Sequence, residues 1–233
     1  MKKTHNKLYV FGSSFSSNDH LYPIGEKELS KWAINNWKRY YDRFGTPDDI
    51  KGGWPTLTSE LLEMELYNAS KGGSTFFEME DGLLRCLEKI NEGDIVIIEV
   101  PFNNRHTLFS PITGVRIAGA EWTLGDVIDG IINEEQAQSY IDYQYHWHNE
   151  VSTKSWDKWY MWRLENWVKL YKEKGAVVIT WVLIEHNKKY ETVGEHTKGV
   201  INDFHWSIKG NEDFFNDFIK RRLIEEGVIK RMI

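Results

Sequence analysis

The chain of 233 residues has only one cysteine and five prolines, and it contains no long apolar run. A single cysteine, Cys86, excludes an internal disulfide and any cysteine-rich metal site. No segment approaches the roughly 20 apolar residues that are needed to cross a bilayer, so a membrane is not an expected partner. The apolar run at residues 8–11 is too short for the core of a signal peptide, which favours a cytoplasmic location.

An excess of basic residues is also missing. The chain has 29 Lys and Arg against 35 Asp and Glu, a net charge of −6. Without a basic stripe to displace counterions from phosphates, nucleic acid is not an expected partner. Aromatic residues, in contrast, are plentiful, with 11 Trp, 11 Tyr and 11 Phe. We interpret most of them as bulky core residues, and a sugar-stacking surface is the alternative.

The hydrophobic pattern alternates between strands and helices. The predicted strands are Lys7–Phe11, Glu65–Asn68, Asp94–Val100 and Ala176–Ile184. The predicted helices are Glu26–Phe44, Pro55–Leu62, Thr75–Ile90, Ser155–Lys174 and Gly210–Glu226. Continuous apolar runs such as DIVIIEV are typical of strands that are buried on both faces of a parallel sheet. The pattern predicts an α/β fold, a three-layer α/β/α sandwich with a mostly parallel, flavodoxin-like sheet.

Residues 1–233 are predicted to form a single domain, because no linker or repeat divides them. The pattern weakens over residues 102–155, which are too long for a plain connection in a compact α/β domain. We interpret this stretch as an insertion near the active face, made of loops and one or two short helices.

Polar residues follow the predicted strands at the points where ligands bind in a parallel sheet. The first strand is followed by GSSFS, the second by NASKGGST and the third by PFNNR, and NDFH precedes the last helix. A serine, a glycine turn, an asparagine and an Asp-x-His pair therefore converge on one edge. These are the parts that acyl transfer needs: a nucleophile, oxyanion donors, a base and a residue that orients the base.

In this order, the four segments resemble the sequence blocks of the SGNH (GDSL-type) hydrolase family. The segment VFGSSFS is similar to the Gly-Asp-Ser block, and the resemblance implies that Ser14 is the nucleophile. The segments NASKGGST and IIEVPFNNR imply Gly73 and Asn103 as oxyanion donors. The segment NDFHWSIKG implies His205 as the base. The resemblance covers nearly the whole chain apart from residues 102–155.

Three positions depart from the family pattern. Ser13 stands where the family usually has aspartate. The glycines that normally precede the oxyanion asparagine are replaced, so either Asn103 or Asn104 is the donor. The family acid lies three residues before the histidine, where this chain has Asn202. We assign the orienting role to Asp203, two residues before the histidine, with Asn202 as the alternative.

The function that the resemblance implies is a serine esterase. Ser14 attacks an ester carbonyl while His205 takes its proton and Asp203 holds the imidazole. The expected substrate is an acyl ester of a small molecule or a carbohydrate, with acetyl as the expected acyl group. No metal and no organic cofactor is expected. The alternative is an SGNH-like binding or structural module, catalytically reduced, in a larger assembly such as a phage particle, which would place the protein in a virion.

Two further patterns have simpler interpretations. His146 and His148 have the spacing of two metal ligands on a strand, but no third ligand lies nearby in the sequence, and we interpret them as surface histidines. Arg105 either holds a substrate carboxylate or pairs with Glu99, and we favour the pairing.

Overall fold

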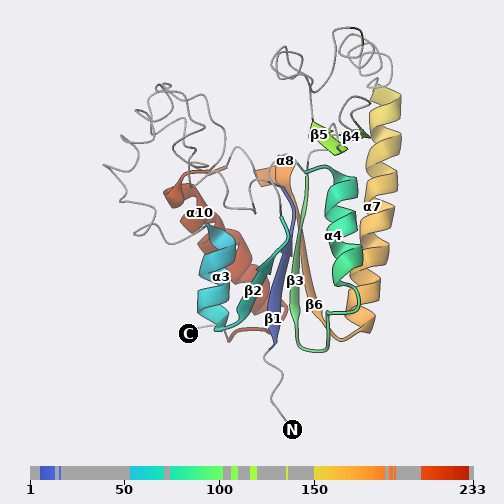
Figure 1. Ribbon diagram of the computed structural model, residues 1–233. Helices are drawn as coiled ribbons and strands as arrows, with labels where there is room; N and C mark the ends of the chain where they lie inside the picture. The colour runs from blue at the N-terminus through green and yellow to red at the C-terminus, as the bar shows by residue number, and fades with distance from the viewer. Residues whose placement is uncertain are drawn as a thin grey trace, which may run out of the picture.

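The computed structural model describes residues 6–13, 16, 53–70, 74–101, 106–109, 116–119, 135, 150–186, 189–190, 192 and 206–230. Its centre is a sheet of four parallel strands in the order β2-β1-β3-β6 (Figure 1). These strands are β1 (Lys7–Phe11), β2 (Glu65–Asn68), β3 (Ile95–Val100) and β6 (Val177–Val182). The four predicted strands are therefore confirmed. The predicted helix 26–44 lies outside the described residues.

Helices cover both faces of the sheet. The helix α3 (Trp54–Leu62) shares one face with the C-terminal helix, which consists of α10 (Ile208–Phe214), η2 (Phe215–Ile219) and α11 (Lys220–Glu225). The helices α4 (Phe76–Cys86) and α7 (Glu150–Glu173) cover the other face (Figure 1). The strand β2 lies on one side of β1, whereas β3 and β6 lie on the other side. Because crossovers between parallel strands are right-handed, this change of side places α3 on the opposite face of the sheet from α4 and α7. The predicted three-layer α/β/α sandwich is confirmed.

The C-terminal helix contains one π-helical turn, η2. The backbone N–H of Lys220 donates to the carbonyl of Phe215, five residues earlier. Phe214, which precedes this turn, and Ile219, which is its last residue, are both fully buried. The whole helix matches the predicted Gly210–Glu226 to within two residues at each end.

The side chains of β1 show how the two cores arise. Tyr9 and Phe11 pack toward α4 and α7, whereas Leu8 and Val10 pack toward α3 and the C-terminal helix. This alternation is the period of two that a strand imposes. The α3 face is rich in tryptophan, since Trp54, Trp181 and Trp206 all lie in its core. For these three residues, the interpretation of the aromatic residues as core is confirmed.

The structure differs from the sequence-based prediction in several places. The helix α4 ends at Cys86, four residues before the predicted end, and α7 begins at Glu150, five residues before the predicted start. The stretch interpreted as loops and short helices contains two antiparallel strands, β4 (His106–Phe109) and β5 (Arg116–Gly119). Each of these strands has only four residues, and, unlike the equally short β2, neither lies next to a predicted helix that would mark its place in the fold. The last strand ends at Val182, two residues early, because the helix α8 (Leu183–His186) follows it directly. None of the described helices is long and apolar enough to cross a membrane.

Candidate active site

The strand order places a topological switch point between β1 and β3. Successive strands are added on opposite sides of β1, and in such sheets a crevice for ligands opens at the carboxyl ends of the two strands. The predicted catalytic residues lie outside the described residues: Ser14, Gly73, Asn103, Asp203 and His205, with the alternatives Asn104 and Asn202. The structure describes their neighbours in the chain, and these neighbours define the candidate site.

The turn after β1 is tied to both neighbouring strands. The backbone N–H of Ser16 donates to the carbonyl of Ser13 at 3.1 Å, so these two residues are held close together in a turn. The hydroxyls of Ser13 and Ser16 both donate to the carboxylate of Glu99 on β3. From β2, the side-chain amide of Asn68 donates to the carbonyl of Ser16 at 2.7 Å. Ser13 and Ser16, which precede and follow the predicted nucleophile in the sequence, are therefore held by contacts from both neighbouring strands.

Gly12 is required where β1 ends because β3 lies so close to it. A Cβ atom at this position would lie 2.5 Å from the Cβ of Glu99 and 2.6 Å from its Oε2. Contacts under 3.0 Å essentially never occur for real Cβ atoms. The glycine of the GSSFS segment thus lets the carboxylate reach the turn.

The end of β2 leads to the amino end of α4. The backbone N–H of Ala69 donates to the carbonyl of Val10 at 2.8 Å, which continues the pairing with β1. Thr75 is the N-cap of α4 in a capping box: the N–H of Glu78 donates to Thr75 Oγ1 at 3.3 Å, and the N–H of Thr75 donates to Glu78 Oε2 at 3.1 Å. The positive end of the helix dipole is therefore fixed two residues after the predicted oxyanion glycine.

The residue after the predicted base, Trp206, packs against β6. Trp206 is fully buried and stacks on Trp181 with 5.7 Å between ring centroids. Trp181 is the register partner of Glu99. Ser207 then caps α10, because its Oγ accepts from the N–H of Gly210 at 3.0 Å. The sequence neighbours of the predicted nucleophile and base thus converge on adjacent positions of β3 and β6.

The histidine that follows β6, His186, belongs to the core. His186 ends α8 and lies buried, with its ring 5.9 Å from that of Trp181 and 4.6 Å from that of Phe218. Burial lowers the pKa of its imidazole, and within the described part of the chain its Nδ1 atom has no hydrogen-bond partner. These surroundings favour a neutral, structural histidine.

Sequence reasoning missed the place of Glu99 at this site. It was interpreted as a partner for Arg105, which lies outside the described residues, as do His146 and His148. A signal was present, since Glu99 interrupts an apolar run that is predicted to be buried on both faces, where a charged residue needs polar partners. Among the described residues, no group of three or more His, Cys, Asp or Glu side chains could hold a metal ion.

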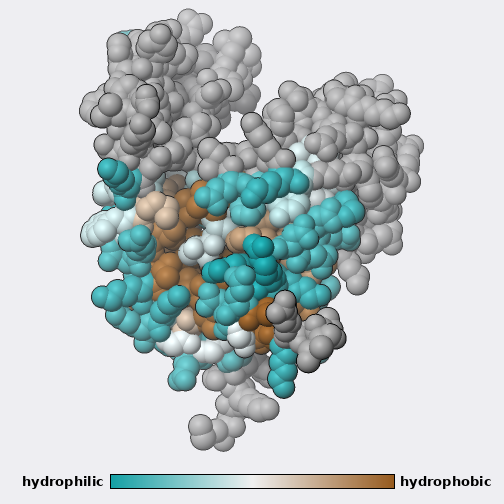
Figure 2. Space-filling view, turned by 180° about the vertical axis from the view of Figure 1, so that it is seen from behind, coloured by the Kyte–Doolittle hydropathy of each residue, from teal (hydrophilic) through white to brown (hydrophobic). Residues whose placement is uncertain are grey.

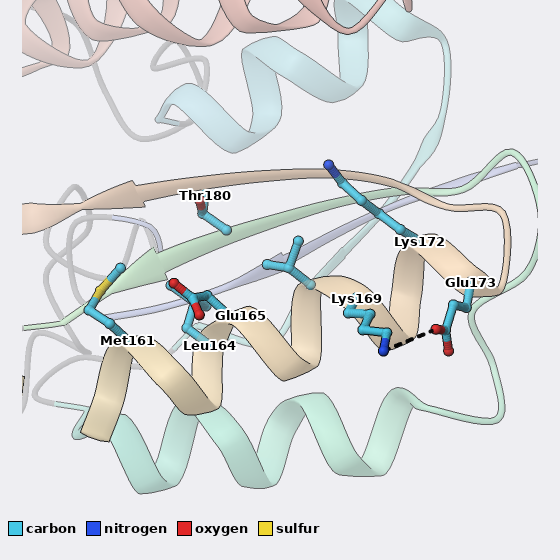
Figure 3. Close-up of a pocket in the computed structure, with 8 residues that line it drawn as sticks. Met161, Leu164, Glu165, Lys169, Lys172, Glu173 and Thr180 are labelled. Atoms are coloured by element: carbon cyan, nitrogen blue, oxygen red, sulfur yellow. Dashed lines mark ion pairs between the residues drawn. The ribbon is translucent and has the colours of Figure 1, made fainter. Parts of the chain in front are cut away.

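A groove of about 610 Å³ lies away from these strand ends, between α7 and β6 (Figure 3). Its apolar lining includes Met161, Leu164 and Val168, and the ion pair of Lys169 and Glu173 lies along α7. The view from behind shows hydrophobic side chains exposed among hydrophilic ones (Figure 2). The described lining comes from α7 and from Thr180 on β6, so this groove follows the edge of the sheet.

The strand order and the switch-point site define the described chain as a doubly wound α/β protein. Comparison with protein-family models and with curated proteins finds no match. Among solved structures, the chain is similar to protein YXIM from Bacillus subtilis, with 13% identity, a TM-score of 0.36 and coverage of 94% of this chain and 49% of that one. The chain thus spans about half the length of the B. subtilis protein.

A second similar structure comes from Desulfitobacterium hafniense and is assigned to the G-D-S-L family of lipolytic proteins. It has 15% identity and a TM-score of 0.35, and the match covers 93% of this chain and 98% of that one.

Proposed function

We propose that the protein is a serine hydrolase that cleaves carboxylic esters, with Ser14 as the nucleophile. The observation that carries the proposal is the turn of residues 13–16 at the switch point. Glu99 and Asn68 hold this turn from the two strands that flank β1. A nucleophile needs a rigid and reproducible position to reach a bound carbonyl at the attack distance. The buried hydroxyls on either side of Ser14 support such a position.

The proposed mechanism uses a triad and an oxyanion hole. Ser14 Oγ forms a bond to the ester carbonyl carbon while His205 accepts the hydroxyl proton. The backbone N–H groups of Ser14 and Gly73 and the side chain of Asn103 stabilise the oxyanion. His205 then gives its proton to the departing alcohol, and water hydrolyses the acyl-enzyme by the same steps. Asp203 orients the imidazole. The mechanism needs no metal and no organic cofactor.

The proposed substrate class is an acyl ester, with an acetyl ester of a carbohydrate as the first candidate. The resemblance to the SGNH family carries this part of the proposal. Trp54, Trp181 and Trp206 do not add to it, because these three side chains lie in the core.

The test is hydrolysis of p-nitrophenyl acetate by the wild type and by Ser14→Ala and His205→Ala. Each substitution is expected to lower kcat/KM by at least about 10³-fold, because triad members act as a unit. Ser59→Ala is the matched control. Its hydroxyl donates to the carbonyl of Met64 at the end of α3, away from the turn, and its activity should equal that of the wild type.

A fluorophosphonate probe gives a second readout that does not depend on the choice of ester. Mass spectrometry should find the adduct on Ser14 in the wild type and none on this peptide in Ser14→Ala. If the wild type forms no adduct, and p-nitrophenyl acetate, p-nitrophenyl butyrate and an acetylated sugar all react at the background rate, the esterase proposal is wrong. The chain would then be a binding or structural module with this fold.

A further inference from the structure

Glu99 is a buried carboxylate on an otherwise apolar part of the sheet. Its side chain is fully buried, and strand alternation places it on the same face of β3 as Ile95 and Ile97. Trp181 stands beside it in register on β6. A carboxylate in such surroundings is strongly disfavoured unless hydrogen bonds replace its hydration. An apolar side chain would fill this space at a lower cost, so the position indicates a specific role for the carboxylate.

Both oxygens of this carboxylate accept hydrogen bonds from the turn after β1. Oε1 accepts from the hydroxyl of Ser13, and Oε2 accepts from the hydroxyl of Ser16. The same carboxylate lies where a side chain at residue 12 would otherwise extend. One group on β3 therefore fixes the backbone before the turn and the side chains at both of its ends.

We infer that Glu99 is a positioning residue, which holds the turn of residues 13–16 and thereby the nucleophile Ser14. The inference rests on the proposed function, because the placement of this turn affects a rate only if Ser14 reacts. Glu99 acts through Ser13 and Ser16, and its effect is on the orientation of the serine that forms the acyl-enzyme.

The same contact explains why the chain departs from the Gly-Asp-Ser block. An aspartate in place of Ser13 would bring a second carboxylate against Glu99, and two carboxylates at this distance repel each other. A serine at this position donates a hydrogen bond instead. Ser13 and Glu99 are therefore a matched pair: the carboxylate on β3 favours a hydrogen-bond donor at position 13 and disfavours an acidic residue there.

The first part of the test compares two buried carboxylates. Glu99→Gln keeps the size of the side chain but leaves one acceptor oxygen for two hydroxyls. We expect kcat for p-nitrophenyl acetate and the rate of fluorophosphonate labelling to fall by about tenfold, because a small displacement of a reacting group is costly, while KM stays within about twofold. Glu80→Gln is the control. Glu80 is also buried, but it lies on α4 and accepts from Arg163 and Trp167. This control should lower the melting temperature and leave kcat per folded molecule unchanged.

The second part tests the matched pair with Ser13→Asp, alone and combined with Glu99→Gln. The single variant should label about 10²-fold more slowly than the wild type, by the same argument from displacement. The double variant should recover at least about tenfold, because residues in contact show non-additive effects. A merely structural carboxylate would change the melting temperature of these variants and leave the labelling rate per folded molecule at the wild-type value.

The outcomes separate the two proposals. An active wild type with a slowed Glu99→Gln and a rescued double variant supports the positioning role. An active wild type in which Glu99→Gln labels at the wild-type rate, or in which the double variant is as slow as the product of the single losses, overturns the positioning role alone. An inert wild type overturns the esterase proposal, and the positioning role with it.

Discussion

The two faces of the sheet each bury a carboxylate, and they satisfy it in different ways. On the α4 and α7 face, Glu80 accepts from the guanidinium of Arg163 at 2.7 Å and from the indole of Trp167 at 2.8 Å. This network joins two helices on the outside of the sheet. On the α3 face, Glu99 lies in the sheet itself and accepts from two serine hydroxyls of a turn. The first arrangement holds helices together, whereas the second holds a loop at the carboxyl end of the strands.

Aromatic side chains occur in both cores. On the α4 and α7 face they include Tyr9 and Phe11 on β1 and Tyr171 on α7. The α3 core contains three tryptophans and His186, and they gather toward the strand ends where the candidate site lies. The comparison indicates that one face provides stability and that the other also positions the groups around the switch point.

The largest expected effect comes from removing the buried indole of Trp206 from the core on the α3 face. Trp206→Ala should lower the free energy of unfolding by about 3–5 kcal/mol, because a fully buried indole leaves a large cavity. Urea denaturation measures this change. The control is Trp162→Ala on α7, where the side chain is 59% exposed and the change should stay within about 0.5 kcal/mol. Equal losses in the two variants would contradict the assignment of Trp206 to the core.

An intermediate effect is expected on the other face. Arg163→Met should cost about 2 kcal/mol, less than for a fully buried pair, because it leaves the Glu80 carboxylate without its cation while Arg163 itself is partly exposed. The matched control is Arg85→Met, which breaks an exposed ion pair with Asp81 and should cost no more than about 0.5 kcal/mol. Esterase activity per folded molecule should be unchanged in both variants. A loss of kcat in Arg163→Met would show that this face also contributes to the site.

The smallest effect is a pH dependence that arises from His186. Burial lowers the pKa of the folded-state imidazole, so below about pH 6.5 the unfolded chain binds a proton that the folded chain does not. The stability that comes from the neutral imidazole is present above that pH, and it is lost as the pH falls toward the folded-state pKa. His186→Phe should therefore lose less stability than the wild type between pH 7 and pH 5.

Urea unfolding of both proteins at pH 5, 6, 7 and 8 measures this difference. The other titratable groups are shared, so they cancel in the comparison. Parallel stability curves across this range would mean that His186 binds its proton equally well in the folded and unfolded states.

The fold was largely predictable because its strands are strongly patterned. The strand at residues 65–68 was predicted at its observed bounds, and the apolar run of β3 differed by one residue at its start. Pro55 predicted a helix start to within one residue, since proline is favoured in the first turn. The antiparallel strands β4 and β5 were missed because they lie in a stretch of weak pattern, whereas the equally short β2 lies between two predicted helices.

The location of the candidate site in the fold could be predicted from the sequence, but the side-chain contacts at the site could not. The polar residues after each strand mark the correct edge, because parallel strands bring their carboxyl ends together. The pairing of Glu99 with Ser13 and Ser16 depends on the register between β1 and β3, which places Gly12 next to Glu99. Register follows from tertiary packing of the whole sheet, and no short segment of the sequence encodes it.

The π-helical turn determines where the C-terminal helix could lose one residue without changing its buried face. In an α-helix, residues five apart differ by about 140° around the axis, yet Phe214 and Ile219 both face the core, as does Leu223 four residues later. The turn thus absorbs one surplus residue and keeps the two halves of the helix in phase. Shortening the chain by one residue within Phe215–Phe218 would convert the turn to ordinary helix with the same faces inward. A one-residue deletion within Lys220–Arg222 would instead rotate Leu223 by about 100° away from the core. The helix therefore tolerates a change of length at the π-helical turn and not after it.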